Sequence, residues 1–114
     1  MKIKLLKSKI HRATITDACL DYEGSISIDQ SLLKASKIIP YEKVHVLNVT
    51  NGNRLETYAI PSNKKGEFCI NGAAAHLINP KDIVIIASYA QMTVDEAKGF
   101  NPTIIYPNEL NEIK

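Results

Sequence analysis

Hydrophobic and polar residues alternate in short runs along most of this chain of 114 residues. Ile3 with Leu5 and Ile26 with Ile28 are each separated by one residue, which is the spacing that places side chains on the same face of a β-strand. The pattern predicts a mainly β fold. Strands are expected near residues 3–5, 13–15, 26–28, 44–49, 55–60, 67–70, 82–90 and 103–106.

Helices are expected to be few and short. Asp29 can cap a helix of about ten residues that ends before Pro40. Thr93 and Glu96 have the spacing of a capping box and predict one or two helical turns. Asn71 can cap a short turn through residues 73–75. The sequence therefore predicts two or three short helices.

An Asn-Gly pair predicts one β-hairpin. Asn51 and Gly52 lie between two β-branched runs, and both residue types tolerate the positive φ of a tight turn. Open strands in this number would leave unprotected sheet edges, so closure into a barrel is favoured. The expected fold is a small β-barrel.

Composition limits the class of protein. A chain of 12.6 kDa with 45% hydrophobic residues suits a single folded domain over residues 1–114. Fourteen basic and twelve acidic residues give a net charge of +2, too little for a dedicated nucleic-acid binder. The longest apolar stretch, residues 83–90, is far shorter than the ~20 residues that span a bilayer. We expect a cytoplasmic protein without nucleic-acid or membrane partners, and free thiols at Cys19 and Cys69.

Common catalytic motifs are missing from the sequence. His11, His45 and His76 lie far apart and there is no Cys-x-x-Cys pair, so no metal site is predicted. The five glycines do not form a phosphate-binding loop, and no serine lies in a nucleophile elbow.

Five polar segments fit poorly as plain strands or turns. Taken one at a time, each has an ordinary interpretation: a solvated strand face, a turn, a hairpin, a β-forming pair or a tightly packed helix start. The segments are residues 9–12, 22–25, 51–54, 57–58 and 71–76.

Together, in this order and at these spacings, the segments resemble the pyruvoyl-dependent aspartate 1-decarboxylase family, the bacterial enzymes that make β-alanine for pantothenate. The resemblance runs from Lys9 to about Pro102. Its motifs are Lys-x-His-Arg, Tyr-x-Gly-Ser, Asn-Val-Thr-Asn-Gly-x-Arg, Thr-Tyr-Ala-Ile, Asn-Gly-Ala-Ala-Ala and Asp-Ile-Val-Ile-Ile-Ala-Ser. The chain departs from the family at Asn79-Pro80-Lys81 and in its short tail after Tyr106.

The resemblance implies a fold, a maturation step and a cofactor. Members of the family are double-psi β-barrels and homotetramers with sites between neighbouring subunits. Cleavage between Gly24 and Ser25 would give a β chain of residues 1–24 and an α chain of residues 25–114. Ser25 would become a pyruvoyl group that forms a Schiff base with L-aspartate, with no metal and no pyridoxal phosphate. Whether a maturation factor is needed stays open.

The resemblance also implies roles for individual side chains. Tyr58 would protonate the carbon that loses carbon dioxide, because a phenol of pKa ~10 keeps its proton at neutral pH. Arg54 would bind a substrate carboxylate, since Arg12 is the only other arginine. The other residues implied to bind substrate, or to assist cleavage, are Lys9, His11, Thr57, Asn71, Gly72, Ala73 and Ala74.

Three alternatives remain from the residues alone. A small barrel that never cleaves itself can serve as a binding or scaffold module, since a fold does not fix a function. The sequence pI of about 8.5 suggests a DNA-binding regulator as the second alternative. The cationic residues are scattered, however, with Lys64-Lys65 the only adjacent lysine pair, which argues against a DNA-binding surface. A pyruvoyl decarboxylase for a different amino acid is the third; Arg54 and Lys9 favour a diacid.

Overall fold

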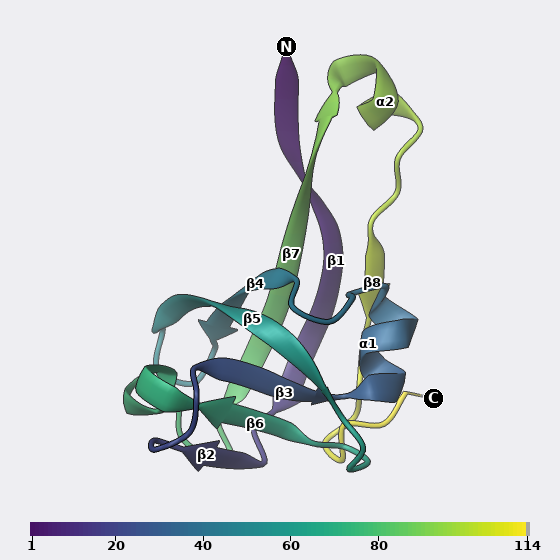
Figure 1. Cartoon of the computed structure of the whole chain (residues 1–114). Coiled ribbons are helices and arrows are strands. Elements are labelled where there is room, and N and C mark those ends of the chain that lie inside the picture. The colour runs from purple at the N-terminus through teal and green to yellow at the C-terminus, as the bar shows by residue number, and fades with distance from the viewer. Residues whose placement is uncertain (114) are drawn as a thin grey trace.

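The computed structural model describes residues 1–113, and eight of its segments are strands of one sheet (Figure 1). The strands are β1 (Lys2–Thr14), β2 (Asp17–Cys19), β3 (Ser25–Asp29), β4 (Lys43–Asn48), β5 (Arg54–Ser62), β6 (Phe68–Asn71), β7 (Ile83–Thr93) and β8 (Thr103–Ile105). The helices are α1 (Gln30–Ser36), the 3₁₀ helix η1 (Gly72–His76) and α2 (Val94–Lys98). The prediction of a mainly β chain with short helices is confirmed.

The sheet is curved but does not close. Its strand order is β2-β6-β3-β5-β4-β7-β1-β8, with parallel pairing of β1 with β8, β2 with β6 and β3 with β5. The predicted closure is wrong for the described residues, because β2 and β8 end the sheet without pairing with each other. Both end strands have only three residues, so each exposes little unpaired backbone. The architecture is consistent with a small β-barrel left open.

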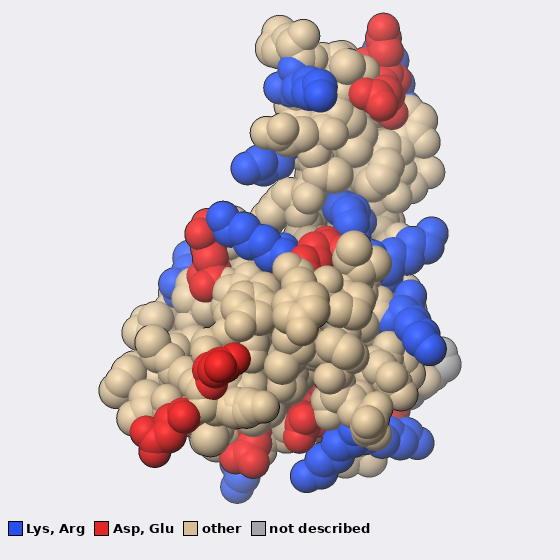
Figure 2. Space-filling model, in the orientation of Figure 1, with Lys and Arg blue, Asp and Glu red and all other residues tan. Residues whose placement is uncertain are grey.

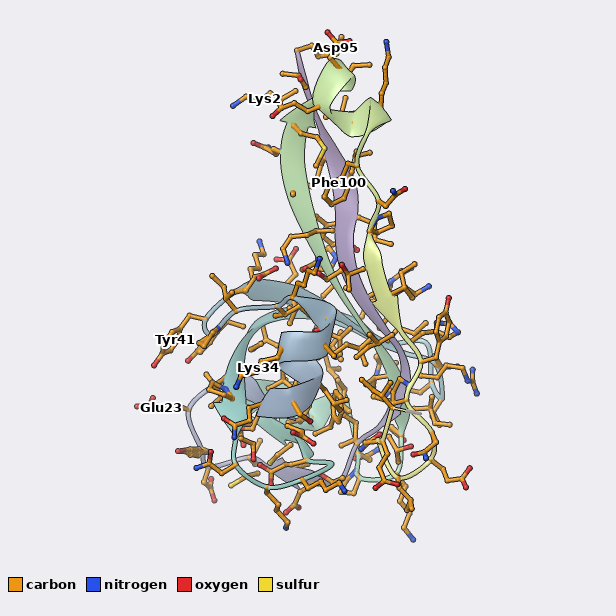
Figure 3. The ribbon with its side chains drawn as sticks, turned by 90° about the vertical axis from the view of Figure 1, so that its right-hand side faces the viewer. Lys2, Glu23, Lys34, Tyr41, Asp95 and Phe100 are labelled. Atoms are coloured by element: carbon orange, nitrogen blue, oxygen red, sulfur yellow. The ribbon has the colours of Figure 1, made fainter. Side chains whose placement is uncertain are left out.

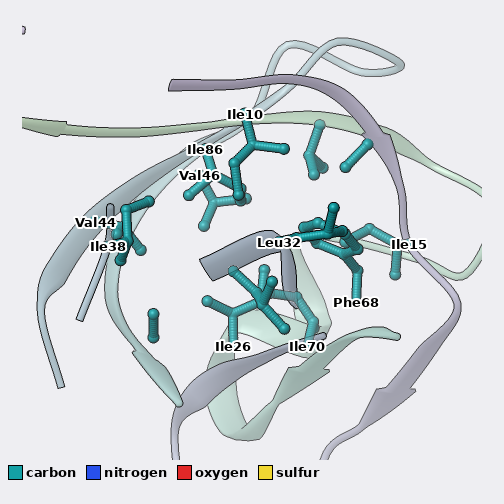
Figure 4. Close-up of a cluster of buried hydrophobic side chains, with 14 of the residues drawn as sticks. Ile10, Ile15, Ile26, Leu32, Ile38, Val44, Val46, Phe68, Ile70 and Ile86 are labelled. Carbon is teal, nitrogen blue, oxygen red and sulfur yellow. The ribbon is translucent and has the colours of Figure 1, made fainter. Parts of the chain in front are cut away.

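The inner face of the sheet carries the core. Alternate residues of β3 and β6 point inward, and Ile26, Ile28, Phe68 and Ile70 are completely buried (Figure 4). The same alternation on β4 and β7 buries Val44, Val46, Val84 and Ile86. The intervening residues of these strands therefore face outward, and the candidate site is built largely from them.

β1 and β7 form an arm that extends beyond the rest of the sheet, with α2 at its tip (Figure 1). The arm gives the molecule principal extents of 43 × 30 × 24 Å. Two separate short strands were expected near residues 3–5 and 13–15, but they belong to one 13-residue strand. Register shifts between Leu6 and Ser8 and between Ile10 and Ala13 interrupt the alternation of inward and outward side chains along β1. The sequence pattern therefore predicted two strands in place of one.

Two of the three predicted helix caps, at Asp29 and Thr93, are present, although α1 is shorter than expected. The Asp29 carboxylate accepts from the Ser31 amide, and Thr93 and Glu96 form a complete capping box. α1 has seven residues instead of about ten, because Lys37 adopts a left-handed conformation with φ of 62°. The Lys37 N–H bonds back to the last turn and ends the helix.

The predicted hairpin joins β4 to β5, with residues 49–53 as its loop. Only Gly52 has a positive φ, of 81°, and its N–H donates to the Asn48 carbonyl at 2.8 Å. The turn is therefore longer than the two-residue turn that Asn51-Gly52 usually forms. The sequence did not predict β2, whose three residues are too few to show a period.

Charged side chains are mixed on the face shown in Figure 2, where Lys and Arg lie among Asp and Glu without forming one basic patch. Within residues 1–113, no helix has the length and apolar character needed to span a bilayer. Cys19 and Cys69 are both free thiols, as expected.

Candidate active site

Ser25 begins β3 with its side chain on the outer face of the sheet, because Ile26 and Ile28 point into the core. Ser25 is nevertheless only 2% exposed. Its hydroxyl donates to the Glu23 carbonyl at 3.4 Å and accepts from Asn71 Nδ2 at 3.1 Å. The sequence therefore places a buried, oriented hydroxyl directly after Gly24.

Asn71 ends β6 and is paired with Ser25 across the antiparallel β3–β6 ladder. Its Nδ2 also donates to Ser27 Oγ at 3.0 Å, and its Oδ1 accepts from Cys69 Sγ at 3.3 Å. The expected capping of the following turn by the Asn71 side chain is wrong, because the amide is committed to these partners. Ser27 and Cys69 were not singled out from the sequence, although residues two apart on paired strands share a face.

Gly72 lets two backbone segments approach closely. Its φ is 74°, and an added Cβ would lie 2.8 Å from Gly24 Cα and 3.0 Å from the Tyr22 carbonyl oxygen. At Gly24, in contrast, an added Cβ would meet nothing within 4 Å. The close approach of the two segments therefore depends on the absence of a side chain at Gly72. Ala73 and Ala74 follow Gly72 in η1, and Ala74 packs against the core.

Tyr58 lies on the same outer face as Ser25. β3 and β5 are parallel, with Ile26 paired with Ala59. Extending this register by one residue places Tyr58 opposite Ser25. The same extension brings Thr57 level with Gly24, half-buried and on the opposite face. Ser25, Asn71 and Tyr58 therefore occupy one region of the sheet.

Tyr41 is a further aromatic neighbour of this region. Its ring centroid lies 6.0 Å from that of Tyr58, with an interplanar angle of 31°. Tyr41 and Glu23 project outward on the same side of the molecule in Figure 3. Tyr41 was not predicted, because no sequence pattern connects it with Tyr58.

Arg54 and Lys9 lie apart from the region around Ser25. Arg54 begins β5 and is exposed, four residues before Tyr58, which is about 13 Å along a strand. Lys9 is paired with Ala87, and β1 is three strands from β5, or about 14 Å. Within one chain, Arg54 and Lys9 are therefore separated from Ser25 and from each other.

His11 lies at the register shift of β1 and packs edge-on against Tyr106, with ring centroids 5.7 Å apart. Within residues 1–113, its Nδ1 is buried without a hydrogen-bond partner. Burial lowers the pKa of His11, and the charges of Lys9 and Arg12 lower it further. His11 is therefore neutral at pH 7. It can shape a pocket, but it does not add positive charge there.

The residues that the structure describes contain no group of three or more His, Cys, Asp or Glu side chains arranged to hold a metal ion. The chemistry that this region offers is that of a buried hydroxyl, an amide and a phenol, with an arginine and a lysine elsewhere on the same chain.

Comparison with known proteins identifies the family. The family model described as aspartate decarboxylase matches residues 1–114. The chain is 54% identical to an aspartate 1-decarboxylase of Campylobacter fetus, over 99% of this chain and 98% of that protein. It is 57% identical to one of Campylobacter jejuni (97% and 88% covered) and 53% identical to one of Legionella pneumophila (97% and 84% covered). These matches do not favour a scaffold module or a DNA-binding regulator, and the chain belongs to the aspartate decarboxylase family.

Proposed function

We propose that the chain decarboxylates L-aspartate to β-alanine and carbon dioxide after cleaving itself between Gly24 and Ser25. The observation that carries the proposal is the buried Ser25 hydroxyl, held by Asn71 Nδ2 beside the Gly24–Ser25 bond. The relatives of this chain are named aspartate 1-decarboxylases, which supports aspartate as the substrate.

Self-cleavage starts with attack of Ser25 Oγ on the Gly24 carbonyl carbon. The new C–O bond forms as the peptide C–N bond breaks, which leaves an ester. Elimination then releases the Gly24 carboxylate as the end of residues 1–24, and water displaces ammonia from the new end of residues 25–114. Asn71 assists by orienting the hydroxyl through its 3.1 Å hydrogen bond.

The pyruvoyl group fits the surroundings of Ser25. A decarboxylase needs an electron sink, and a pyruvoyl group supplies one that no unmodified side chain offers. The Asn71 amide, already within hydrogen-bond distance of Ser25 and Ser27, would hold the group by donating to its oxygen atoms.

Tyr58 is the proposed proton donor. Its side chain shares the outer face with Ser25. The phenol proton would pass to the carbon from which carbon dioxide has left. Thr57, level with Gly24 by strand register, would assist the cleavage step.

Arg54 and Lys9 would bind the substrate carboxylates from a second copy of the chain. On one chain the backbone of Arg54 lies about 13 Å along β5 from that of Tyr58, and Lys9 lies three strands away. A homotetramer with sites between neighbouring subunits would bring the groups together. This assembly would also explain why Arg54 has no ion-pair partner within residues 1–113.

Arg54→Ala should retain self-cleavage and lose aspartate turnover. Removing a charged partner of a buried carboxylate costs about 2–5 kcal/mol, so kcat/KM should fall by about 30-fold to several thousandfold. Steady-state assays of carbon dioxide release measure the change. Arg12→Ala, which removes the other arginine, is the matched control and should stay within a few-fold of the parent enzyme. Normal turnover by Arg54→Ala would contradict this role and would assign carboxylate binding to Arg12 or Lys9.

A further inference from the structure

Two adjoining grooves lie on the outer face around β4 and β5, and a single carboxylate lines both. One, of about 490 Å³, is lined by Lys4, Lys43, Val44, His45, Glu56 and Tyr89. The other, of about 280 Å³, is lined by His45, Leu47, Arg54, Leu55 and Glu56. Glu56 thus lies among cations, in the groove that also contains Arg54.

Glu56 is held on the side away from Arg54. Its Oε1 accepts from His45 Nε2 at 2.9 Å, and its Oε2 lies 3.2 Å from Lys43 Nζ. These contacts lower the pKa of Glu56, the hydrogen bond from His45 most, so the carboxylate is ionised at neutral pH. His45 Nδ1 lies 3.1 Å from the Tyr89 hydroxyl oxygen, and this second hydrogen bond fixes the imidazole.

Glu56 and Arg54 are close enough to pair if Glu56 is released. Both residues are exposed, and they are two apart on β5, so their side chains leave the same face about 7 Å apart. Two long side chains span that distance easily, and a carboxylate is the preferred bidentate partner of a guanidinium. Such a pair would occupy the donors that a substrate carboxylate needs.

We infer that His45 is a positioning residue for substrate binding: by holding the Glu56 carboxylate, it keeps the Arg54 guanidinium free for aspartate. The inference rests on the proposed role of Arg54 and adds a positioning residue that lies outside the sequence motifs. Lys43, on the neighbouring position of the same strand face, shares the carboxylate.

The test is a rescue experiment in the self-cleaved enzyme. His45→Ala should raise the KM for aspartate about two- to fivefold, the range expected when an exposed ion pair competes for the guanidinium. Its kcat and its self-cleavage should not change. The double variant His45→Ala/Glu56→Gln should return KM to the parent value, because the competing charge is gone. A merely structural role of His45 would not be rescued by a second substitution.

Lys65 and Glu112 provide a matched control, since they form an exposed ion pair 3.3 Å apart that lines neither groove. Lys65→Ala should leave KM unchanged. An unchanged KM in His45→Ala, or a KM that stays raised in the double variant, overturns the inference. Arg54→Ala distinguishes failure of the proposed function from failure of the inference. If its turnover is normal, Arg54 does not bind the substrate carboxylate, and the role of His45 is wrong as well. If Arg54→Ala is impaired but Glu56→Gln gives no rescue, only the role of His45 is wrong.

Discussion

Ser25→Ala should remain a single uncut chain without decarboxylase activity. Alanine has no hydroxyl to attack the Gly24 carbonyl, so neither fragment nor electron sink can form. The fold should persist, because the substitution removes one oxygen from a site where Asn71 Nδ2 keeps its 3.0 Å bond to Ser27. Gel electrophoresis shows whether the chain is cut, and carbon dioxide release from labelled aspartate shows the activity.

Ser27→Ala is the matched control for that experiment. Ser27 lies two residues along β3 and accepts from the same Asn71 amide, but its hydroxyl is not next to the Gly24 carbonyl. The variant should still be cut between residues 24 and 25. Cleavage of Ser25→Ala at that bond, or activity without cleavage, would contradict the assignment of the nucleophile.

Tyr58→Phe should cleave normally and turn over aspartate ~10²–10⁴-fold more slowly, the usual loss when a positioned general acid is removed. The ring, its packing beside Tyr41 and the strand are all retained, so only the proton is lost. Cleavage uses the Ser25 hydroxyl and Asn71, which the substitution does not touch. Single-turnover and steady-state rates of β-alanine formation measure the effect.

Tyr41→Phe provides the comparison for Tyr58, since it removes a hydroxyl from the adjacent ring, which is exposed. Its turnover should remain within a few-fold of the parent enzyme. A fully cleaved Tyr58→Phe enzyme that makes β-alanine at the parent rate would assign the proton to water or to another residue. Tyr58 would then be a packed strand aromatic.

Features that depend on neighbouring residues in the chain could be predicted from the sequence. The caps at Asp29 and Thr93 and the hairpin after β4 follow from local hydrogen bonding and turn preference. The end of α1 could not be predicted, because Lys37 takes a left-handed conformation that its side chain does not favour. The continuity of β1 and the open sheet depend on strand pairing, which local patterns do not encode.

The candidate site divides in the same way. Motif spacing identified Ser25, Asn71 and Tyr58, and strand register places all three on one face. Ser27 and Cys69 were missed, because their contacts with Asn71 arise only when β3 and β6 lie side by side. Tyr41 was missed because it lies in the segment between α1 and β4 and meets Tyr58 only when that segment packs against β5. The hold of His45 on Glu56 likewise depends on β4–β5 register, where the two residues are directly opposite.

The central claim is that this chain becomes an enzyme by cutting itself before Ser25. Intact mass spectrometry after prolonged warm incubation tests it most directly. The expected spectrum contains two fragments, residues 1–24 and residues 25–114, and the larger fragment should resist amine-specific labelling at its first residue. A single full-length mass, both for the protein alone and after addition of a cell extract able to supply a maturation factor, would contradict the account.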